Sequence, residues 1–348
     1  MHPERPQAPL RLDFDDDALI ANWKALDRLS GAARAGAAVK ANAYGTGARH
    51  AVPLLLEAGC RDFFVAHWGE VADAVPAVDP GMVSVLHGPL TQADAAFAKA
   101  CGVKPVINSL AQARRWLAAG GGRCDLMVDT GMNRLGVAMD ELGDPALAQL
   151  DVDVLLSHLV ASEEDTPLNE VQRSRWMEAR GALTHRRASL ANSAGIGLGE
   201  AYHGDLTRPG LGLYGGLPRA EMAPHLRQVV RPQVAVLQVR DLEAGQSVGY
   251  NATFTAPRAM RVGALALGYA DGFLRCWSGK GMFRDGEGAA LPVLGRVSMD
   301  LTVVDLGAAP HVREGDWLTL DYSLPEASEV SGLTQYELLT SLGRRFGR

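Results

Sequence analysis

Four features are scarce or missing in this sequence of 348 residues, and each absence excludes a class of protein. Only four cysteines occur and no two have Cys-x-x-Cys spacing, which argues against a disulfide framework or a zinc site. No apolar run approaches the length of a membrane span, and residues 1–17 lack the apolar core of a secretory signal. Positive charge is not in excess, because the formal net charge is −6. We therefore predict a cytoplasmic protein with no nucleic-acid partner, no membrane partner and no metal site.

The composition is that of a soluble globular protein, with 47% hydrophobic and 21% charged residues. The chain is longer than one ordinary domain, although a barrel domain alone can take about 200–250 residues. Two domains are therefore expected.

One pattern repeats from residue 17 to residue 228. Short apolar runs typical of strands alternate with amphipathic runs typical of helices, such as residues 17–28, 50–58, 111–119 and 168–182. The eight strand candidates are residues 37–40, 63–67, 83–87, 104–108, 125–129, 152–157, 187–191 and 211–214. Eight strand–helix units in about 200 residues favour a (β/α)8 barrel. An open doubly wound sheet usually has fewer strands and a Gly-x-Gly-x-x-Gly turn after the first, where this chain has Lys-Ala-Asn-Ala-Tyr-Gly.

The pattern changes after residue 228. Strand-like runs follow one another at residues 232–240, 247–254, 261–267, 290–294, 301–305 and 317–320, with little helix before residues 333–342. A series of strands after a series of alternating elements indicates a separate domain. We predict an α/β fold with a barrel domain over residues 1–228 and a mostly-β domain over residues 229–348.

Lys40 is the most unusual residue of the barrel pattern. It follows Ala37, Ala38 and Val39, which belong inside, and an unpaired buried charge is unfavourable. A lowered pKa would leave the neutral amine that attacks carbonyl groups. The alternative is a lysine at a strand end whose amine reaches water, and residues 37–40 alone favour that reading.

Other polar residues follow the carboxyl ends of the predicted strands, where barrel enzymes place their chemistry. They are Arg134 after the fifth strand, His158 after the sixth, Asn192 and Ser193 after the seventh, and Arg208 before the last. Ser193 and the amides near Gly210 and Leu211 suit the phosphate site that barrels often build beside their last two strands. Taken singly, each residue is as well explained by a capping or ion-pairing role.

The stretch VKANAYGTG at residues 39–47 resembles the lysine motif of the alanine racemases. Five further stretches resemble motifs of that family: VDTGMNRLG at 128–136, ANSAG at 191–195, RPGLGLYG at 208–215, GYADG at 268–272 and GRVSMD at 295–300. Val248-Gly249-Tyr250 matches another. The resemblance covers both predicted domains, and it implies a homodimeric, pyridoxal-phosphate (PLP)-dependent isomerase that interconverts L-alanine and D-alanine for peptidoglycan.

The resemblance also implies a role for each matching residue. Lys40 would hold PLP and act as one catalytic base, and Tyr250 of the partner subunit would be the second base. The cofactor would further be held by Tyr44, His158, Asn192, Ser193, Arg208, Gly210 and Leu211, with Arg208 at the pyridine nitrogen. Arg134, Tyr269, Met299 and Asp300 would serve the substrate side, the last two from the partner.

Two positions depart from the family pattern. Met127 stands where relatives often have a lysine that can be carbamylated and that steadies the arginine corresponding to Arg134. The carboxy-terminal tyrosine that often contacts phosphate has no counterpart in residues 340–343. The departures leave open what orients Arg134 and what replaces the tyrosine at the phosphate. For Arg134 the candidates are a bound inorganic anion or a nearby carboxylate such as Asp129. The alternative is that Met127 simply packs in the barrel and Arg134 needs only the cofactor oxygen.

Three alternatives compete with this interpretation. A non-catalytic PLP-binding barrel would lack the β domain that carries Tyr250. A decarboxylase of the same two-domain plan would have an acidic residue in place of Arg208 and a cysteine in place of Ser298. A racemase of wider specificity, acting for example on serine, stays open because a few side chains set the volume of such a pocket.

Overall fold

The computed structural model describes residues 7–343 and 345–346, and the chain divides into two compact units. One unit spans residues 16–227, and the other combines residues 228–346 with the described residues before position 16. Among the described helices, none is both long and apolar enough to cross a bilayer.

The larger unit is a parallel barrel. Seven strands pair in the order of the chain: β3 (Ala37–Ala38), β4 (Phe63–Val65), β5 (Val83–Val85), β6 (Lys104–Ile107), β7 (Arg123–Met127), β8 (Asp151–Leu156) and β9 (Arg187–Ser189). The eighth, β10 (Leu206–Thr207), pairs in parallel with β2 (Arg34–Ala35), which continues into β3. Backbone bonds close the ring on both sides of β10, from Gly36 N to Thr207 O (2.9 Å) and from Arg208 N to Ala191 O (2.9 Å). The prediction of a (β/α)8 barrel is confirmed.

The predicted eighth strand at residues 211–214 is wrong. Those residues form a 3-10 helix, η6 (Leu211–Tyr214), which ends at Gly215 in the left-handed conformation (φ 86°). A short buried apolar run has no periodicity that separates strand from helix. Arg208 consequently follows the last strand instead of preceding it.

Helices cover the barrel strands. The longer ones are α1 (Asp16–Leu29), α3 (Ala48–Ala58), α5 (Gln92–Cys101), α6 (Leu110–Ala118) and α8 (Pro167–Ala182), and α4 (Val71–Ala74), α7 (Pro145–Ala148) and α9 (Ser193–Gly197) are short. Thr91, Ser109 and Thr166 cap α5, α6 and α8 by accepting backbone N–H bonds, as N-cap residues do. Inside the barrel a cluster of apolar side chains includes Met127 and Leu156.

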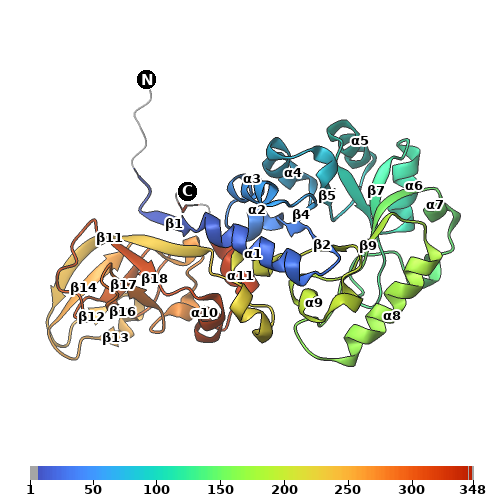
Figure 1. Cartoon of the computed structure of the whole chain (residues 1–348). Helices are drawn as coiled ribbons and strands as arrows, with labels where there is room; N and C mark the ends of the chain where they lie inside the picture. Colours follow the sequence, from blue (N-terminus) through green and yellow to red (C-terminus); the bar gives the residue numbers. More distant parts are fainter. Residues whose placement is uncertain (1–6, 344, 347–348) are drawn as a thin grey trace, which may run out of the picture. The chain divides into compact units, whose positions relative to one another are not determined.

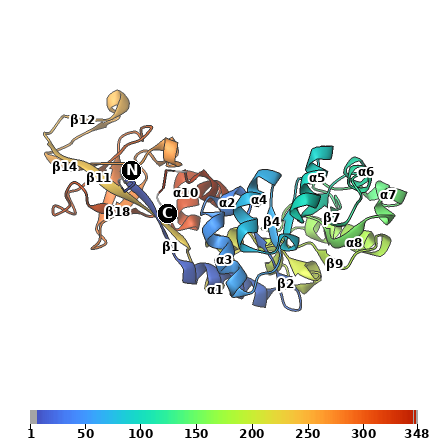
Figure 2. The ribbon, with the colours of Figure 1, turned by 90° about the horizontal axis from the view of Figure 1, so that it is seen from above.

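The smaller unit contains a closed antiparallel barrel. Its strands pair in the order β11 (Val230–Leu242), β14 (Met260–Leu265), β17 (Thr302–Asp305), β16 (Ala290–Leu294), β15 (Met282–Arg284) and β18 (Trp317–Leu320), and β18 returns to β11. β1 (Leu10–Phe14) also pairs with β11, and Figures 1 and 2 show the two strands side by side. Two helices, α10 (Leu324–Ser331) and α11 (Gln335–Ser341), end the unit. The prediction of a β-rich second part is confirmed.

One predicted strand of this unit is a hairpin. Residues 247–254 form β12 (Ser247–Val248), the 3-10 turn η8 (Tyr250–Ala252) and the start of β13 (Phe254–Thr255). Gly249, Asn251 and Ala252 all have positive φ, which strands do not tolerate. The turn places Tyr250 at a loop tip.

Candidate active site

Lys40 begins a left-handed turn at the end of β3. It is the first residue of α2 (Lys40–Tyr44), and the four residues after it have φ between 52° and 55°. Each left-handed residue other than glycine costs roughly 1–2 kcal/mol, so neighbouring contacts must hold the turn. Asn42 Oδ1 accepts a bond from Ala48 N at 2.9 Å, and the Tyr44 ring stacks on Tyr214 at 5.1 Å.

The lysine is half-buried in a positively charged setting. Burial lowers the pKa of Lys40, and the charge of Arg134 lowers it further. Glu70 opposes this shift, and Arg208 adds a smaller lowering effect. Among the described residues, no group forms a hydrogen bond or ion pair with the Lys40 amine. A larger share of neutral amine, the nucleophilic form, is the chemical result.

A cradle of polar atoms lies beside this turn. Ser193 Oγ accepts bonds from the amides of Gly210 (2.9 Å) and Gly212 (3.1 Å). The Tyr44 hydroxyl approaches so closely that a Cβ on Gly210 would lie 2.1 Å from it, which only glycine allows. Leu211 follows as the first residue of η6 and is buried. Of the predicted phosphate-side residues, the structure therefore brings Tyr44, Ser193, Gly210 and Leu211 together.

Asn192 lies next to the cradle, but its side-chain oxygen is used in hydrogen bonds within the fold. Its Oδ1 accepts bonds from Gly195 N (2.8 Å) and from Ser162 Oγ (3.0 Å), which makes it the N-cap of α9. Its backbone carbonyl accepts from Ile196 N at 3.1 Å, so the side-chain NH2 group is the part of Asn192 left to donate to a ligand.

Arg208 is fully buried and has only neutral hydrogen-bond acceptors. It donates to Ser189 Oγ, to Ser157 O at 2.5 Å and to Leu190 O at 3.5 Å. Burial lowers the pKa of Arg208 to about 10, an effect that Asp125 partly opposes. The guanidinium thus stays charged at neutral pH without a paired carboxylate, and it is suited to an electron-rich group of a ligand.

His158 lies within the field of the same cations. Burial, followed by the charges of Arg208 and Arg134, lowers the pKa of His158 to about 3. The imidazole is therefore neutral at physiological pH.

Arg134 lies in the loop that follows β7 and is exposed. Asp129 Oδ1 accepts bonds from the amides of Gly131 and Met132, both at 2.8 Å. In the described parts of the chain, Arg134 makes no hydrogen bond or ion pair. Met127 packs inside the barrel core, and what orients Arg134 stays a prediction.

The remaining predicted site residues belong to the β unit. Tyr269 begins η9 (Tyr269–Asp271), and its amide donates to Ser298 O at 3.0 Å, next to Met299. Arg345 pairs with Asp300 at 2.7 Å, and the side chains of Tyr250 and Met299 are 63% and 53% exposed. Tyr269, Met299 and Asp300 thus share one group of loops. A Cβ on Gly295 would lie 2.9 Å from Val248 O, so the hairpin of Tyr250 packs near the start of the same segment.

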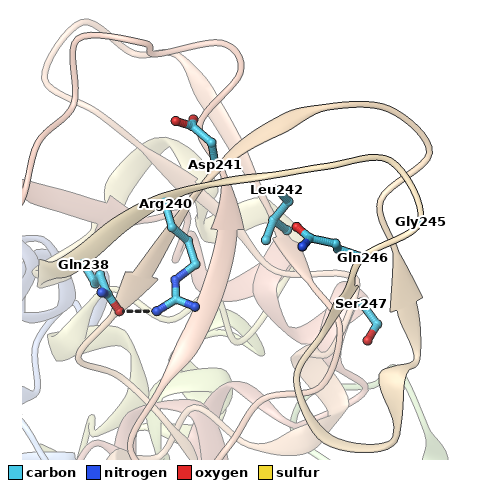
Figure 3. Close-up of a pocket in the computed structure, with 7 residues that line it drawn as sticks. All are labelled: Gln238, Arg240, Asp241, Leu242, Gly245, Gln246 and Ser247. Carbon is cyan, nitrogen blue, oxygen red and sulfur yellow. Dashed lines mark hydrogen bonds between the residues drawn. The ribbon is translucent and has the colours of Figure 1, made fainter.

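A pocket of this unit lies away from the predicted residues. Residues of β11, of the turn before β12 and of the start of β12 line it (Figure 3): Gln238, Arg240, Asp241, Leu242, Gly245, Gln246 and Ser247. Arg240 donates to Gln238 Oε1 at 2.8 Å across its wall. This pocket contains none of the predicted site residues and is open to the surface.

Sequence reasoning missed Glu70, which the structure places directly against the lysine turn. Its Oε1 accepts a bond from Ala41 N at 2.8 Å. The available signal was its position shortly after the second strand, at the same end of the barrel as Lys40. Tyr214 was also missed as a support of Tyr44, because it was assigned to a strand.

Comparison with known proteins covers both units. Residues 14–218 match the model of the alanine racemase N-terminal domain, and residues 229–348 match that of the C-terminal domain. An alanine racemase of Rhodospirillum rubrum is 42% identical over 100% of this chain and 96% of its own length. One of Methylobacterium nodulans is 40% identical over 97% of this chain and 95% of its own.

Solved structures of alanine racemases also match this chain. An alanine racemase of Bartonella henselae, with covalently bound pyridoxal phosphate, superposes with a TM-score of 0.90 at 32% identity over 99% of each chain. A biosynthetic alanine racemase of Pseudomonas aeruginosa gives 0.86 at 32% identity over 98% of this chain and 99% of its own. With both domain models matched and relatives aligned along almost its whole length, this chain belongs to the alanine racemase family.

Proposed function

We propose that this protein is a PLP-dependent alanine racemase that interconverts L-alanine and D-alanine by a two-base mechanism and supplies D-alanine for peptidoglycan. The observation that carries the proposal is the half-buried Lys40 at the carboxyl end of a parallel barrel, whose pKa is lowered by burial and by the charges of Arg134 and Arg208. The relatives support it, because they are alanine racemases that align with this chain along almost their whole length. The four free cysteines fit a cytoplasmic enzyme.

The residues of the barrel rim fit PLP. Lys40 supplies the amine for a carbonyl carbon, and the cradle of Tyr44, Ser193, Gly210 and Leu211 suits a phosphate group beside the last strands. Arg208, charged and without a carboxylate in hydrogen-bond range, suits the pyridine nitrogen. Asn192 and His158 complete the cofactor residues. When bound, PLP supplies electron withdrawal that makes the α-proton of the amino acid acidic.

The chain's own residues move the proton. Lys40 Nζ removes it from one face or returns it there, which requires the neutral amine that burial and the adjacent arginines favour. The Tyr250 hydroxyl acts on the other face. Arg208 cannot release its proton at neutral pH, so it acts as a fixed donor. Arg134, Tyr269, Met299 and Asp300 bind and orient the substrate.

The site is proposed to be shared between two copies of the chain. Tyr250 and Met299 are exposed in the single chain, at 63% and 53%, as expected of residues that serve a partner subunit. We propose a homodimer in which the unit of residues 16–227 forms the cofactor domain and the β unit of the partner supplies the second base. A racemase of wider specificity shares every one of these features.

A chiral assay with a panel of L-amino acids tests the proposal. We expect alanine to be converted to an equal mixture of its enantiomers, with other amino acids slower. Borohydride reduction followed by peptide mapping should fix the cofactor on Lys40. Absence of racemisation by the PLP-loaded protein, or cofactor fixed on a different lysine, would show the proposal to be wrong, and faster turnover of serine would establish the wider specificity.

Met127 leads to a separate prediction about chloride. A thioether is neutral and a weak acceptor, so it cannot supply the anion that a carbamylated lysine would give to Arg134. Because no carboxylate of the described residues pairs with Arg134, we expect an inorganic anion to take this place. Activity should rise with chloride at constant ionic strength and ignore bicarbonate. Activity independent of chloride would mean that Arg134 needs only the cofactor.

A further inference from the structure

The pairing of β3 and β4 ends in an unusual way beside Lys40. Two regular rungs join the strands, from Ala37 N to Asp62 O (2.8 Å) and from Val39 N to Phe64 O (2.9 Å). In a parallel ladder the next donor is two residues further on, which is Ala41 N. No backbone carbonyl takes this bond. It goes to the carboxylate of Glu70, at 2.8 Å.

The same carboxylate also holds the other strand. Glu70 lies at the end of η1 (Trp68–Glu70), and its Oε2 accepts a bond from Ala66 N at 2.6 Å, directly after β4. Its two oxygens therefore bridge the third residue after β3 and the first residue after β4. His67 Nε2 lies 3.7 Å from Oε1.

The bridge acts on the residue that follows Lys40. Ala41 is the first of the four left-handed residues, and its amide is the point at which the chain leaves the strand. Without an acceptor there, the turn loses its connection to β4. Its other supports, at Asn42 and Tyr44, lie further along the chain.

We propose that Glu70 is a positioning residue, which places the Lys40 amine for reaction by tying Ala41 and Ala66 together through one carboxylate. The inference rests on the proposed function, because it assumes that Lys40 is the reacting lysine. Glu70 is also the one group that opposes the lowering of the Lys40 pKa. Its removal therefore changes the charge around the amine as well as its position.

Glu70→Gln is the sharpest test. Glutamine has the same length, but its amide group would point an N–H donor at one of the two backbone donors, so one bond is lost. Glu57→Gln is the matched control, since Glu57 is exposed on α3. Glu70→Asp keeps the charge but cannot span both amides.

Three measurements are made on the PLP-loaded enzymes: alanine kinetics, hydrogen exchange and melting temperature. For Glu70→Gln we expect kcat to fall about 10–100-fold, typical of a displaced reacting group, with a smaller change in KM. Exchange should quicken in peptides that contain Ala41 or Ala66. The melting temperature should stay within about 3 °C of the parent value, which excludes general unfolding. Glu70→Asp should resemble Glu70→Gln, and Glu57→Gln should match the parent.

The outcomes separate this inference from the proposed function. A parent enzyme that is inactive, or whose cofactor is not fixed on Lys40, removes the proposed function. An active, correctly labelled parent with a fully active Glu70→Gln variant overturns the role of Glu70 alone. A parent-like Glu70→Asp beside an impaired Glu70→Gln would show that the charge matters and the bridge does not.

Discussion

Mixing two inactive variants, Lys40→Ala and Tyr250→Phe, is expected to restore racemase activity. Each change removes one proposed base, and a positioned acid–base group typically contributes about 10²–10⁴-fold to the rate. In a mixed dimer with shared sites, one site loses both bases. The other combines Lys40 of one chain with Tyr250 of its partner and is intact. Random exchange makes about half of all dimers mixed, so about a quarter of the sites should recover.

The controls make this result specific. Two differently tagged Lys40→Ala preparations, exchanged in the same way, should recover nothing. Pull-down through one tag verifies that mixed dimers have formed. If verified mixed dimers stay inactive, Lys40 and Tyr250 act within one chain and the shared site is excluded. The exposure of Tyr250, at 63%, is the structural reason to expect recovery.

Polar residues that follow predicted strands indicated much of the candidate site from the sequence alone. A lysine, an arginine and a histidine after the first, fifth and sixth strands all had to lie at one end of a barrel. In the structure, Lys40, Arg134 and Arg208 all act on the pKa of His158. The catalytic roles given to these residues stay predictions, because contacts alone do not assign chemistry.

The left-handed turn after Lys40 could not have been predicted from local sequence. Ala41 and Ala43 favour right-handed helix, and such preferences are weak beside tertiary contacts. Here the contacts come from residues distant in the chain: Glu70 holds Ala41, and Gly210 leaves room for the Tyr44 hydroxyl. The eighth strand was misplaced for a related reason. Leu206–Thr207 is two residues long, too short to carry a pattern, and only its neighbours define it.

Replacing Arg208 by glutamate is the second change for which we expect a large effect. Arg208 is a buried donor whose acceptors include Ser157 O and Leu190 O. A glutamate would place carboxylate oxygens, which only accept hydrogen bonds, next to these carbonyl oxygens. Because that arrangement and burial both disfavour the charged form, the carboxyl would take up a proton. The protonated carboxyl would then transfer its proton to the pyridine nitrogen. Arg208, in contrast, would donate a hydrogen bond there without releasing its proton. Loss of a positioned electrostatic group typically lowers the rate about 10–10³-fold, and we expect racemisation to fall within that range.

A side reaction distinguishes this electrostatic role of Arg208 from a purely structural one. With a protonated pyridine, more electron density would be drawn into the ring, so transfer of the amino group from alanine to the cofactor should compete with racemisation. Pyruvate should then appear, up to one molecule for each bound cofactor. Arg208→Lys, which keeps the charge but has fewer donors, is the matched variant and should form little pyruvate. Melting temperatures of both variants show whether the fold survives the loss of the Ser189 and Ser157 contacts. A folded Arg208→Glu enzyme that racemises alanine at the parent rate and makes no pyruvate would mean that Arg208 only supports the barrel.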